Sequence, residues 1–200
     1  MKRLIYLFIF LFIFSQPVFA DDKSDVDAML RERMDNVISL LQKNDMDKQK
    51  RNAEILETII PIFDFEKMGK LSLGRKYWPT LNEEQQKEYT SLFVERIQES
   101  YIEKLDLYSD EEAVYEEPFM VKKKIRIMTH LVSKDNDVDM LYKFYKSKRG
   151  WKIYDVEIQG VSIVQTYRSQ FDGILKKGTV ETLLAKLQRS GNFALPDGKK

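Results

Sequence analysis

The sequence predicts a single α+β domain, in which a curved antiparallel sheet carries helices packed on one face. Apolar residues recur every three to four positions before residue 108, every second position between residues 119 and 158, and every three to four positions again after residue 162. The first period is typical of amphipathic helices and the second of strands with one buried face. Because helices and strands are segregated along the chain, and no long linker divides it, we expect one layered domain.

Residues 1–20 are predicted to be a signal peptide rather than part of the fold. Lys2 and Arg3 precede an apolar run of eleven residues at 4–14, and Val18-Phe19-Ala20 fits a cleavage site with small side chains at its first and last positions. The run is shorter than the roughly 20 residues that a membrane-spanning helix needs. We therefore expect export with cleavage after Ala20, and an uncleaved membrane anchor is the alternative.

The composition excludes several classes of function. The chain has 33 basic and 32 acidic residues, and removing Lys2 and Arg3 leaves 31 basic and 32 acidic ones. A nucleic-acid-binding protein needs a clear basic excess to neutralise phosphates, so we expect no nucleic acid as a partner. The absence of cysteine excludes thiol catalysis and cysteine-ligated zinc, and it leaves packing alone to stabilise the fold.

Cap and breaker residues mark four helices in the first half of the chain. Ser24, Asp64 and the overlapping candidates Thr80 and Asn82 are suited to accept hydrogen bonds from the free N–H groups of a first helical turn. Pro61 stops a helix, and Gly74 suits the left-handed residue that closes one. The predicted helices run from Ser24 to about residue 43, from about Asp47 to Ile60, from Asp64 to about Gly74, and from Glu83 to Leu107.

The second half predicts an antiparallel meander followed by two helices. The acidic segment 109–117 is interpreted as a link between the helices and the strands, and Lys123 interrupts the alternation that follows it. Ser162 and Thr179 are candidate helix caps, and Gly178 and Gly191 are stops. The predicted strands lie at 119–131, 138–144 and 151–158, with turns at 135–137 and 147–150, and the predicted helices lie at 163–177 and 180–190.

Catalytic signals are weak. His130 is the single histidine of the chain and matches no catalytic motif, so a surface or structural role is the better interpretation. Asp155 lies in a bulky strand, where a carboxylate in an apolar cup is a candidate general base; a structural acid is the alternative interpretation. The sequence has no Gly-rich phosphate loop, no G-x-S-x-G and no metal-ligand spacing. We predict no catalytic residue, no metal and no cofactor.

Three blocks of the sequence are distinctive: FDFEKMGKLSLGRKYW at 63–78, EEQQKEYTSLFVERIQESY at 83–101 and GWKIYDVEIQGVSIVQTYRSQF at 150–171. Taken together, they resemble the MlaC family of periplasmic phospholipid-binding proteins, also called toluene-tolerance proteins. The blocks and their flanking helices cover most of the chain after the signal peptide, so the resemblance implies one domain at 21–191. The residues after Gly191, 192–200, are interpreted from their composition as a polar tail. The segment from Tyr108 to Glu117 belongs to none of these blocks, and its role stays open.

The resemblance implies a periplasmic carrier without catalytic activity. Such a carrier takes a glycerophospholipid between an outer-membrane lipoprotein complex and an inner-membrane ABC transporter that bears an MCE-domain protein. A hopanoid-associated branch of the family makes a hopanoid-type lipid the alternative ligand. The sheet and helices are expected to enclose an apolar cavity for the acyl chains and to leave the headgroup near solvent.

The acyl chains set the requirement for the cavity wall. Exposing them to water costs about 0.8 kcal/mol per CH₂, so two chains of about 16 carbons cost on the order of 25 kcal/mol. Arg168 and Lys76 are candidates to meet the headgroup phosphate, and surface solvation is the alternative for both. The candidate wall residues are Phe65, Met68, Leu71, Phe93, Ile97, Tyr101, Val121, Ile125, Ile127, Met140, Phe144, Ile153, Val161, Tyr167 and Phe171.

Two other classes of function stay open from the residues alone. Composition does not separate a solid core from a lined cavity, and each wall candidate taken singly is as compatible with core packing as with lipid contact. One alternative is a small-molecule isomerase or hydrolase with Asp155 as its base. The other is an envelope protein-interaction module whose apolar face binds protein partners.

Overall fold

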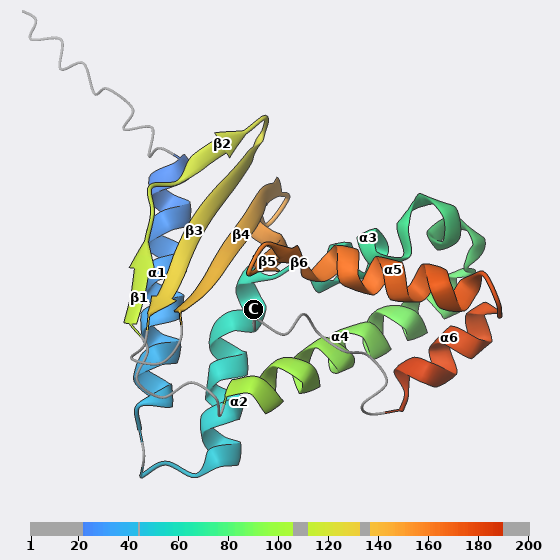
Figure 1. Cartoon of the computed structure of the whole chain (residues 1–200), viewed down its shortest axis with the longest axis horizontal. Coiled ribbons are helices and arrows are strands. Elements are labelled where there is room, and N and C mark those ends of the chain that lie inside the picture. Colours follow the sequence, from blue (N-terminus) through green and yellow to red (C-terminus); the bar gives the residue numbers. More distant parts are fainter. Residues whose placement is uncertain (1–21, 44, 106–111, 133–136, 190–200) are drawn as a thin grey trace, which may run out of the picture.

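The computed structural model describes residues 22–43, 45–105, 112–132 and 137–189, with the backbone alone for 101–105. The predicted signal peptide with its cleavage site, most of the predicted turn at 135–137, and the polar tail lie outside the described residues. The described elements confirm an α+β fold (Figure 1). The helices are α1 (Asp22–Leu41), α2 (Lys48–Ile59), α3 (Phe65–Tyr77), α4 (Glu83–Leu105), α5 (Ile163–Leu175) and α6 (Val180–Leu187), with short 3₁₀ turns η1 (Ile60–Ile62) and η2 (Trp78–Thr80).

The sheet is antiparallel throughout. Its strands are β1 (Glu112–Tyr115), β2 (Phe119–Val121), β3 (Lys124–Val132), β4 (Asp137–Ser147), β5 (Gly150–Ile158) and β6 (Val161–Ser162). The order is β1-β3-β4-β5-β6, and β2 pairs with the beginning of β3. A bulge between Lys143 and Phe144 leaves Tyr154 of β5 without a direct partner, which increases the local twist of the sheet.

Two strands differ from the sequence prediction. The acidic segment at 109–117, interpreted as a link, contains β1, which pairs with β3 from Glu112 to Tyr115. The predicted strand at 119–131 is a hairpin, because Val121 pairs with Lys124 across a two-residue turn. Lys123, which interrupts the alternation of the sequence, lies in that turn beside Lys122, whose φ is 58°.

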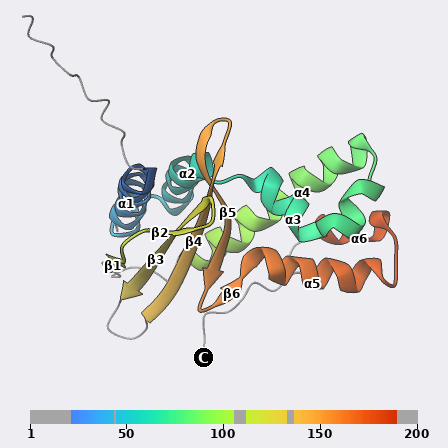
Figure 2. The ribbon, with the colours of Figure 1, turned by 90° about the horizontal axis from the view of Figure 1, so that it is seen from above.

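One face of the sheet, the inner face, is apolar and covered by helix α1. Ile125 pairs with Phe144 and Ile127 with Tyr142, so these side chains point to the same side. Tyr142 donates a hydrogen bond to the sulfur of Met34 in α1, 3.4 Å away. Helix α2 packs on α1 through a small separate cluster, and Figure 2 shows both helices on the same side of the strands.

Helices α3 to α6 form a bundle beside the β5–β6 edge of the sheet (Figures 1 and 2). Small residues on α3 allow close packing there. A Cβ at Gly69 would lie 3.1 Å from the Phe93 ring of α4, and the Ser72 hydroxyl lies 3.5 Å from the Val164 carbonyl of α5. The backbone N–H of Asp64 donates to the Ile153 carbonyl at 2.8 Å, which joins the bundle to β5.

The predicted caps at Asp64, Asn82, Ser162 and Thr179 are confirmed, whereas the hydroxyl of Thr80, the overlapping candidate, donates to the Tyr77 carbonyl. Asp64 accepts from Lys67 N, Ser162 from Gln165 N, and Asn82 exchanges two hydrogen bonds with Gln85. The predicted start of the first helix at Ser24 is wrong, since α1 begins at Asp22. No helix of the described part of the chain is long and apolar enough to cross a membrane.

Candidate functional site

Most of the predicted wall residues meet in one continuous core between the inner face and the helices. Phe65 and Met140 are half-buried and pack against it. Nine further candidates are fully enclosed: Met68, Phe93, Ile97, Ile125, Ile127, Phe144, Ile153, Tyr167 and Phe171. Their contact with lipid stays a prediction.

The part of this core inside the helical bundle is packed ring to ring. The Phe93 ring lies 5.3 Å from that of Tyr167 and 6.3 Å from that of Phe171. Tyr89, absent from the predicted wall, stacks on Phe93 at 5.8 Å and donates to the Gly69 carbonyl. The aromatic rings of the bundle thus pack against one another, and an apolar cavity beside them stays a prediction.

The inner face contains a polar group that the predicted wall omits. Thr129 is 0 % exposed, and its hydroxyl has no hydrogen-bond partner among the described residues. Its strand partners Tyr115 and Met140 flank it on the same face. The alternation of β3 already indicated that Thr129 points inward, whereas its missing partner is visible only in three dimensions. A buried hydroxyl without a partner is costly, which marks this position as unusual.

Three predicted wall residues lie elsewhere, and a fourth lies outside the described side chains. Leu71 is 37 % exposed, because α3 buries the arc formed by Met68, Gly69, Ser72 and Leu73. The small residues of that arc admit α4 and α5, and Leu71 lies on another side of the helix. The side chain of Tyr101 lies outside the described residues.

Val121 and Val161 are the other two predicted wall residues that lie elsewhere. The β2–β3 hairpin explains the position of Val121, and the short strand β6 explains that of Val161. Val121 pairs with Lys124, so its side chain shares the outer face of the sheet with Lys124 rather than the inner face with Ile125. The prediction of one continuous strand assigned it the wrong parity. Val161 is 46 % exposed, since it directly follows the turn at Gln159 and Gly160.

The two predicted headgroup cations share one surface cleft. Lys76 of α3 and Arg168 of α5 line a cleft of about 300 Å³ whose other lining residues are Leu73, Tyr77, Gln165, Ser169 and Asp172. Leu73 is 2 % exposed and belongs to the main core, so the floor of the cleft is continuous with the predicted wall. The sequence placed these two cations 92 positions apart, and the packing of α3 on α5 brings them together.

The polar groups of the cleft are ordered by hydrogen bonds. Tyr77 accepts a bond from the Lys76 ammonium at 2.9 Å and donates one to Asp172 at 3.1 Å. The Lys176 ammonium beside Asp172, 2.6 Å away, lowers the pKa of that carboxyl. Arg168 has no acidic partner among the described residues. Since the single carboxylate is already paired, the cleft has a positive excess and suits an anion.

Asp155 is enclosed by donors rather than placed in an apolar cup. It accepts from the Lys143 ammonium at 2.8 Å, from the Ser162 hydroxyl at 2.8 Å and from Val164 N at 3.2 Å. Lys143 also binds Glu157. Burial lowers the pKa of Lys143, but the bonds to Asp155 and Glu157 raise it more, so the net shift is upward. This arrangement fixes the start of α5 on the sheet and favours the structural interpretation of Asp155.

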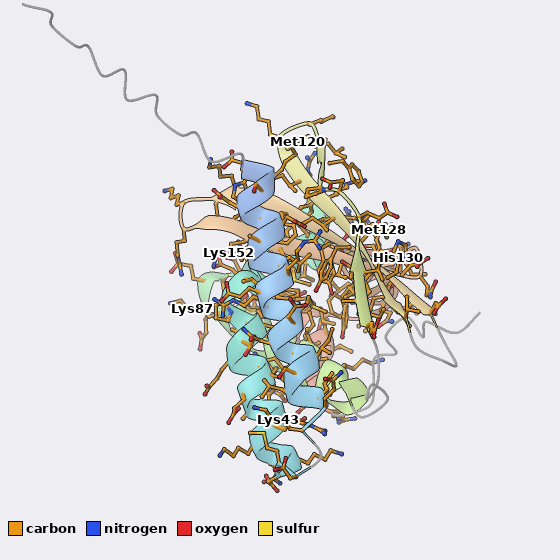
Figure 3. All side chains as sticks on the ribbon, turned by 90° about the vertical axis from the view of Figure 1, so that its left-hand side faces the viewer. Lys43, Lys87, Met120, Met128, His130 and Lys152 are labelled. Carbon is orange, nitrogen blue, oxygen red and sulfur yellow. The ribbon has the colours of Figure 1, made fainter. Side chains whose placement is uncertain are left out.

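His130 lies on the outer face, away from the wall residues, where Figure 3 shows it beside β1. Its ring nitrogens lie 2.7 Å from Asp139 and 2.9 Å from Glu116. The hydrogen bonds to these carboxylates raise the pKa of His130. Within the described residues, no group of histidine, aspartate and glutamate side chains has a metal-binding arrangement.

Comparison with known proteins places the chain in a family. The profile of the MlaC protein family matches residues 31–189, which is most of the chain. The chain belongs to the MlaC family. The match begins within α1 and ends after α6, so it includes the complete sheet and the helical bundle.

Two members or neighbours of the MlaC family show how far the likeness extends. The intermembrane phospholipid transport system binding protein MlaC of Haemophilus influenzae is 27 % identical over 176 residues, which cover 82 % of this chain and 81 % of that protein. A phospholipid-binding protein of Ralstonia solanacearum, solved in complex with a phospholipid, has a TM-score of 0.72 and 23 % identity. The likeness covers 84 % of this chain and 96 % of that one, and it confirms the fold.

Proposed function

We propose that this MlaC-family protein is a carrier that binds a phospholipid by its acyl chains and shuttles it between membranes. The observation that carries the proposal is the family match over residues 31–189, which span the inner face of the sheet and the helices that cover it. The H. influenzae relative is named for intermembrane phospholipid transport, and the R. solanacearum neighbour holds a phospholipid.

The acyl chains are proposed to enter between the inner face and the covering helices. The apolar side chains on both sides of that interface would then exchange contacts with each other for contacts with CH₂ groups, at a small net cost per unit of apolar area. Exchange of this kind suits a carrier that must release its lipid again. The proposed wall is Phe65, Met68, Phe93, Ile97, Ile125, Ile127, Met140, Phe144, Ile153, Tyr167 and Phe171.

The headgroup phosphate is proposed to lie in the cleft lined by Lys76 and Arg168. Support comes from the positive excess of the cleft and from Leu73, which joins its floor to the core. Gln165, Ser169 and Tyr77 add groups that can hydrogen-bond to a glycerol or phosphate oxygen. A hopanoid-type lipid has no phosphate in its ring system. A requirement for Lys76 and Arg168 in binding would therefore favour a glycerophospholipid over a hopanoid-type lipid as the ligand.

The setting of the carrier is likewise a proposal. We place the mature domain at 21–191, exported to the periplasm, with an inner-membrane MCE-domain ABC transporter complex and an outer-membrane lipoprotein complex as partners. No enzymatic role is proposed, because the relatives are named for binding and transport and because Asp155 is paired with Lys143. The direction of transport is left open.

Organic-solvent extraction of the purified protein followed by mass spectrometry tests the carriage of lipid. We expect phospholipid in stoichiometric amount and uptake of phospholipid from vesicles after delipidation. Lys76→Gln with Arg168→Gln should reduce uptake, while Lys177→Gln, which changes an exposed lysine outside the cleft, should not. A protein that contains no phospholipid and takes none from vesicles contradicts the proposal.

A further inference from the structure

The two turns at one end of the sheet form a surface that lipid carriage does not explain. Lys124 pairs with Tyr145, so the β2–β3 turn and the β4–β5 turn both lie beyond this pair, at the same end of β3 and β4. Figure 1 shows the β2–β3 hairpin projecting past the helices at the top of the view. We call this surface the basic tip and define it as Phe119, Met120, Lys122, Lys123, Lys124, Lys146, Lys148 and Arg149.

The apolar residues of the basic tip are exposed on both sides of one strand. Phe119 and Met120 are 42 % and 47 % exposed, and as neighbours in β2 they point to opposite faces. A strand with apolar residues on both faces is typical of burial on both sides. Here the described residues leave nearly half of each side chain exposed, and Figure 3 places Met120 at the extremity of the molecule. Apolar surface of the hairpin is therefore exposed on both faces of β2.

The charges of the basic tip have one sign. Lys146 pairs with Asp22 at 2.8 Å, and the Lys124 ammonium lies 4.1 Å from the centre of the Tyr154 ring. Lys122, Lys123, Lys148 and Arg149 are exposed and have no acidic partner among the described residues. A chain with nearly equal numbers of basic and acidic residues thus concentrates uncompensated positive charge around two exposed apolar side chains, Phe119 and Met120.

We propose that the basic tip docks on the surface of a bilayer that contains anionic phospholipid. Phe119 and Met120 would enter the boundary between headgroups and acyl chains, and the four unpaired cations would lie near the phosphates. A protein partner seated on one face of the hairpin would cover one of the two apolar side chains, whereas the interfacial layer of a bilayer surrounds both. This proposal goes beyond lipid carriage, because it concerns the attachment of the protein to a membrane surface and not the lipid that the protein binds.

Co-sedimentation with vesicles tests the proposal. The purified protein is mixed with vesicles of phosphatidylethanolamine and phosphatidylglycerol, or with vesicles of phosphatidylcholine alone. We expect binding to the anionic vesicles, weakened by added salt, and little binding to phosphatidylcholine. Phe119→Ser with Met120→Ser, and Lys122→Glu with Lys123→Glu, should each lower the partition coefficient about tenfold or more.

A matched control places the same charge change far from the tip. Lys43→Glu with Lys87→Glu alters two exposed lysines, one just after the end of α1 and one on α4, and Figure 3 shows Lys43 at the end of the molecule opposite Met120. This variant should sediment like the unchanged protein apart from the general effect of net charge. All variants should unfold at the same temperature and retain the same phospholipid content by mass spectrometry.

Three outcomes overturn the proposal. One is failure of the unchanged protein to sediment with anionic vesicles, including the case in which it binds an acidic protein surface instead. Another is an equal loss in the tip and control variants, which assigns binding to net charge. The third is that the tip variants lose both their carried phospholipid and their sedimentation with vesicles. A tip variant that carries phospholipid but no longer sediments supports docking and leaves the proposed carriage intact.

Discussion

Gly74 and Arg168 are in direct contact across the interface of α3 and α5: a Cβ added at Gly74 would lie 2.8 Å from a guanidinium nitrogen of Arg168. Gly74 also has a φ of 69°, a left-handed conformation that interrupts α3. Both the left-handed φ and the lack of space favour glycine at position 74, because Arg168 occupies the space that any side chain there would need.

Replacement of Gly74 by alanine should therefore destabilise the protein by about 1–3 kcal/mol, from backbone strain and from displacement of Arg168. Urea unfolding measures the loss. Gly173→Ala is the matched control, since a Cβ there meets nothing within 4 Å, and it should be neutral or stabilising. Equal stability of Gly74→Ala and the unchanged protein would contradict this reading of the kink.

Replacement of Asp155 by asparagine should cost about 3 kcal/mol, because it leaves the ammonium of Lys143 with one carboxylate in a largely buried site. The side chains of Lys143 and Asp155 are 11 % and 7 % exposed. Chemical denaturation measures the loss, and Asp139→Asn on the exposed outer face is the control. A loss of catalytic turnover with unchanged stability would instead favour the isomerase or hydrolase alternative.

His130 should make stability depend weakly on pH. Hydrogen bonds to Asp139 and then Glu116 raise the pKa of His130 from its ordinary 6.5. The stabilisation is therefore complete below about pH 6.5 and is lost as the pH rises through the higher pKa of the folded protein. Its size is a fraction of a kcal/mol, since Glu116 and Asp139 are more than half exposed.

The measurement is the difference in melting temperature between the unchanged protein and His130→Asn. We expect a small positive difference at about pH 5.5 that vanishes at about pH 9. A difference that grows with rising pH would show that the neutral imidazole, and not the charged one, is stabilising.

Replacement of Thr129 by valine should leave stability unchanged or increase it by about 1 kcal/mol, because it removes a buried hydroxyl that has no partner among the described residues. Thermal unfolding of the delipidated protein measures this. Thr129→Ala is the comparison, since it also removes a methyl group and should be destabilising. A clear loss of stability in Thr129→Val would mean that the hydroxyl has a partner in the folded protein.

Local signals made much of the fold predictable. Asp64, Asn82 and Ser162 cap helices through hydrogen bonds to residues three positions away, which a sequence displays directly. The β2–β3 turn was missed because its residues are Lys122 and Lys123, without the Asn-Gly or Asp-Gly pair that favours a two-residue turn. The broken alternation at Lys123 was the available signal.

The candidate site was predictable to the extent that burial follows local periodicity. Ile125, Ile127 and Phe144 alternate in strands and are buried as expected. Leu71 is not, because the buried arc of α3 is decided by the long-range approach of α4 and α5 to Gly69 and Ser72. The cleft that unites Lys76 and Arg168 depends on the same helix contact, so no spacing in the sequence displays it.

Among the described residues, strand β1 pairs with β3 alone and therefore forms an open edge of the sheet. Exposed backbone N–H and C=O groups on such an edge invite a second molecule to add its own strand. Here the edge is four residues long and is bordered by the exposed carboxylates of Glu112, Glu116 and Glu117. Two molecules meeting edge to edge would bring these like charges together. Mutual repulsion at this border should keep the protein monodisperse when it is concentrated.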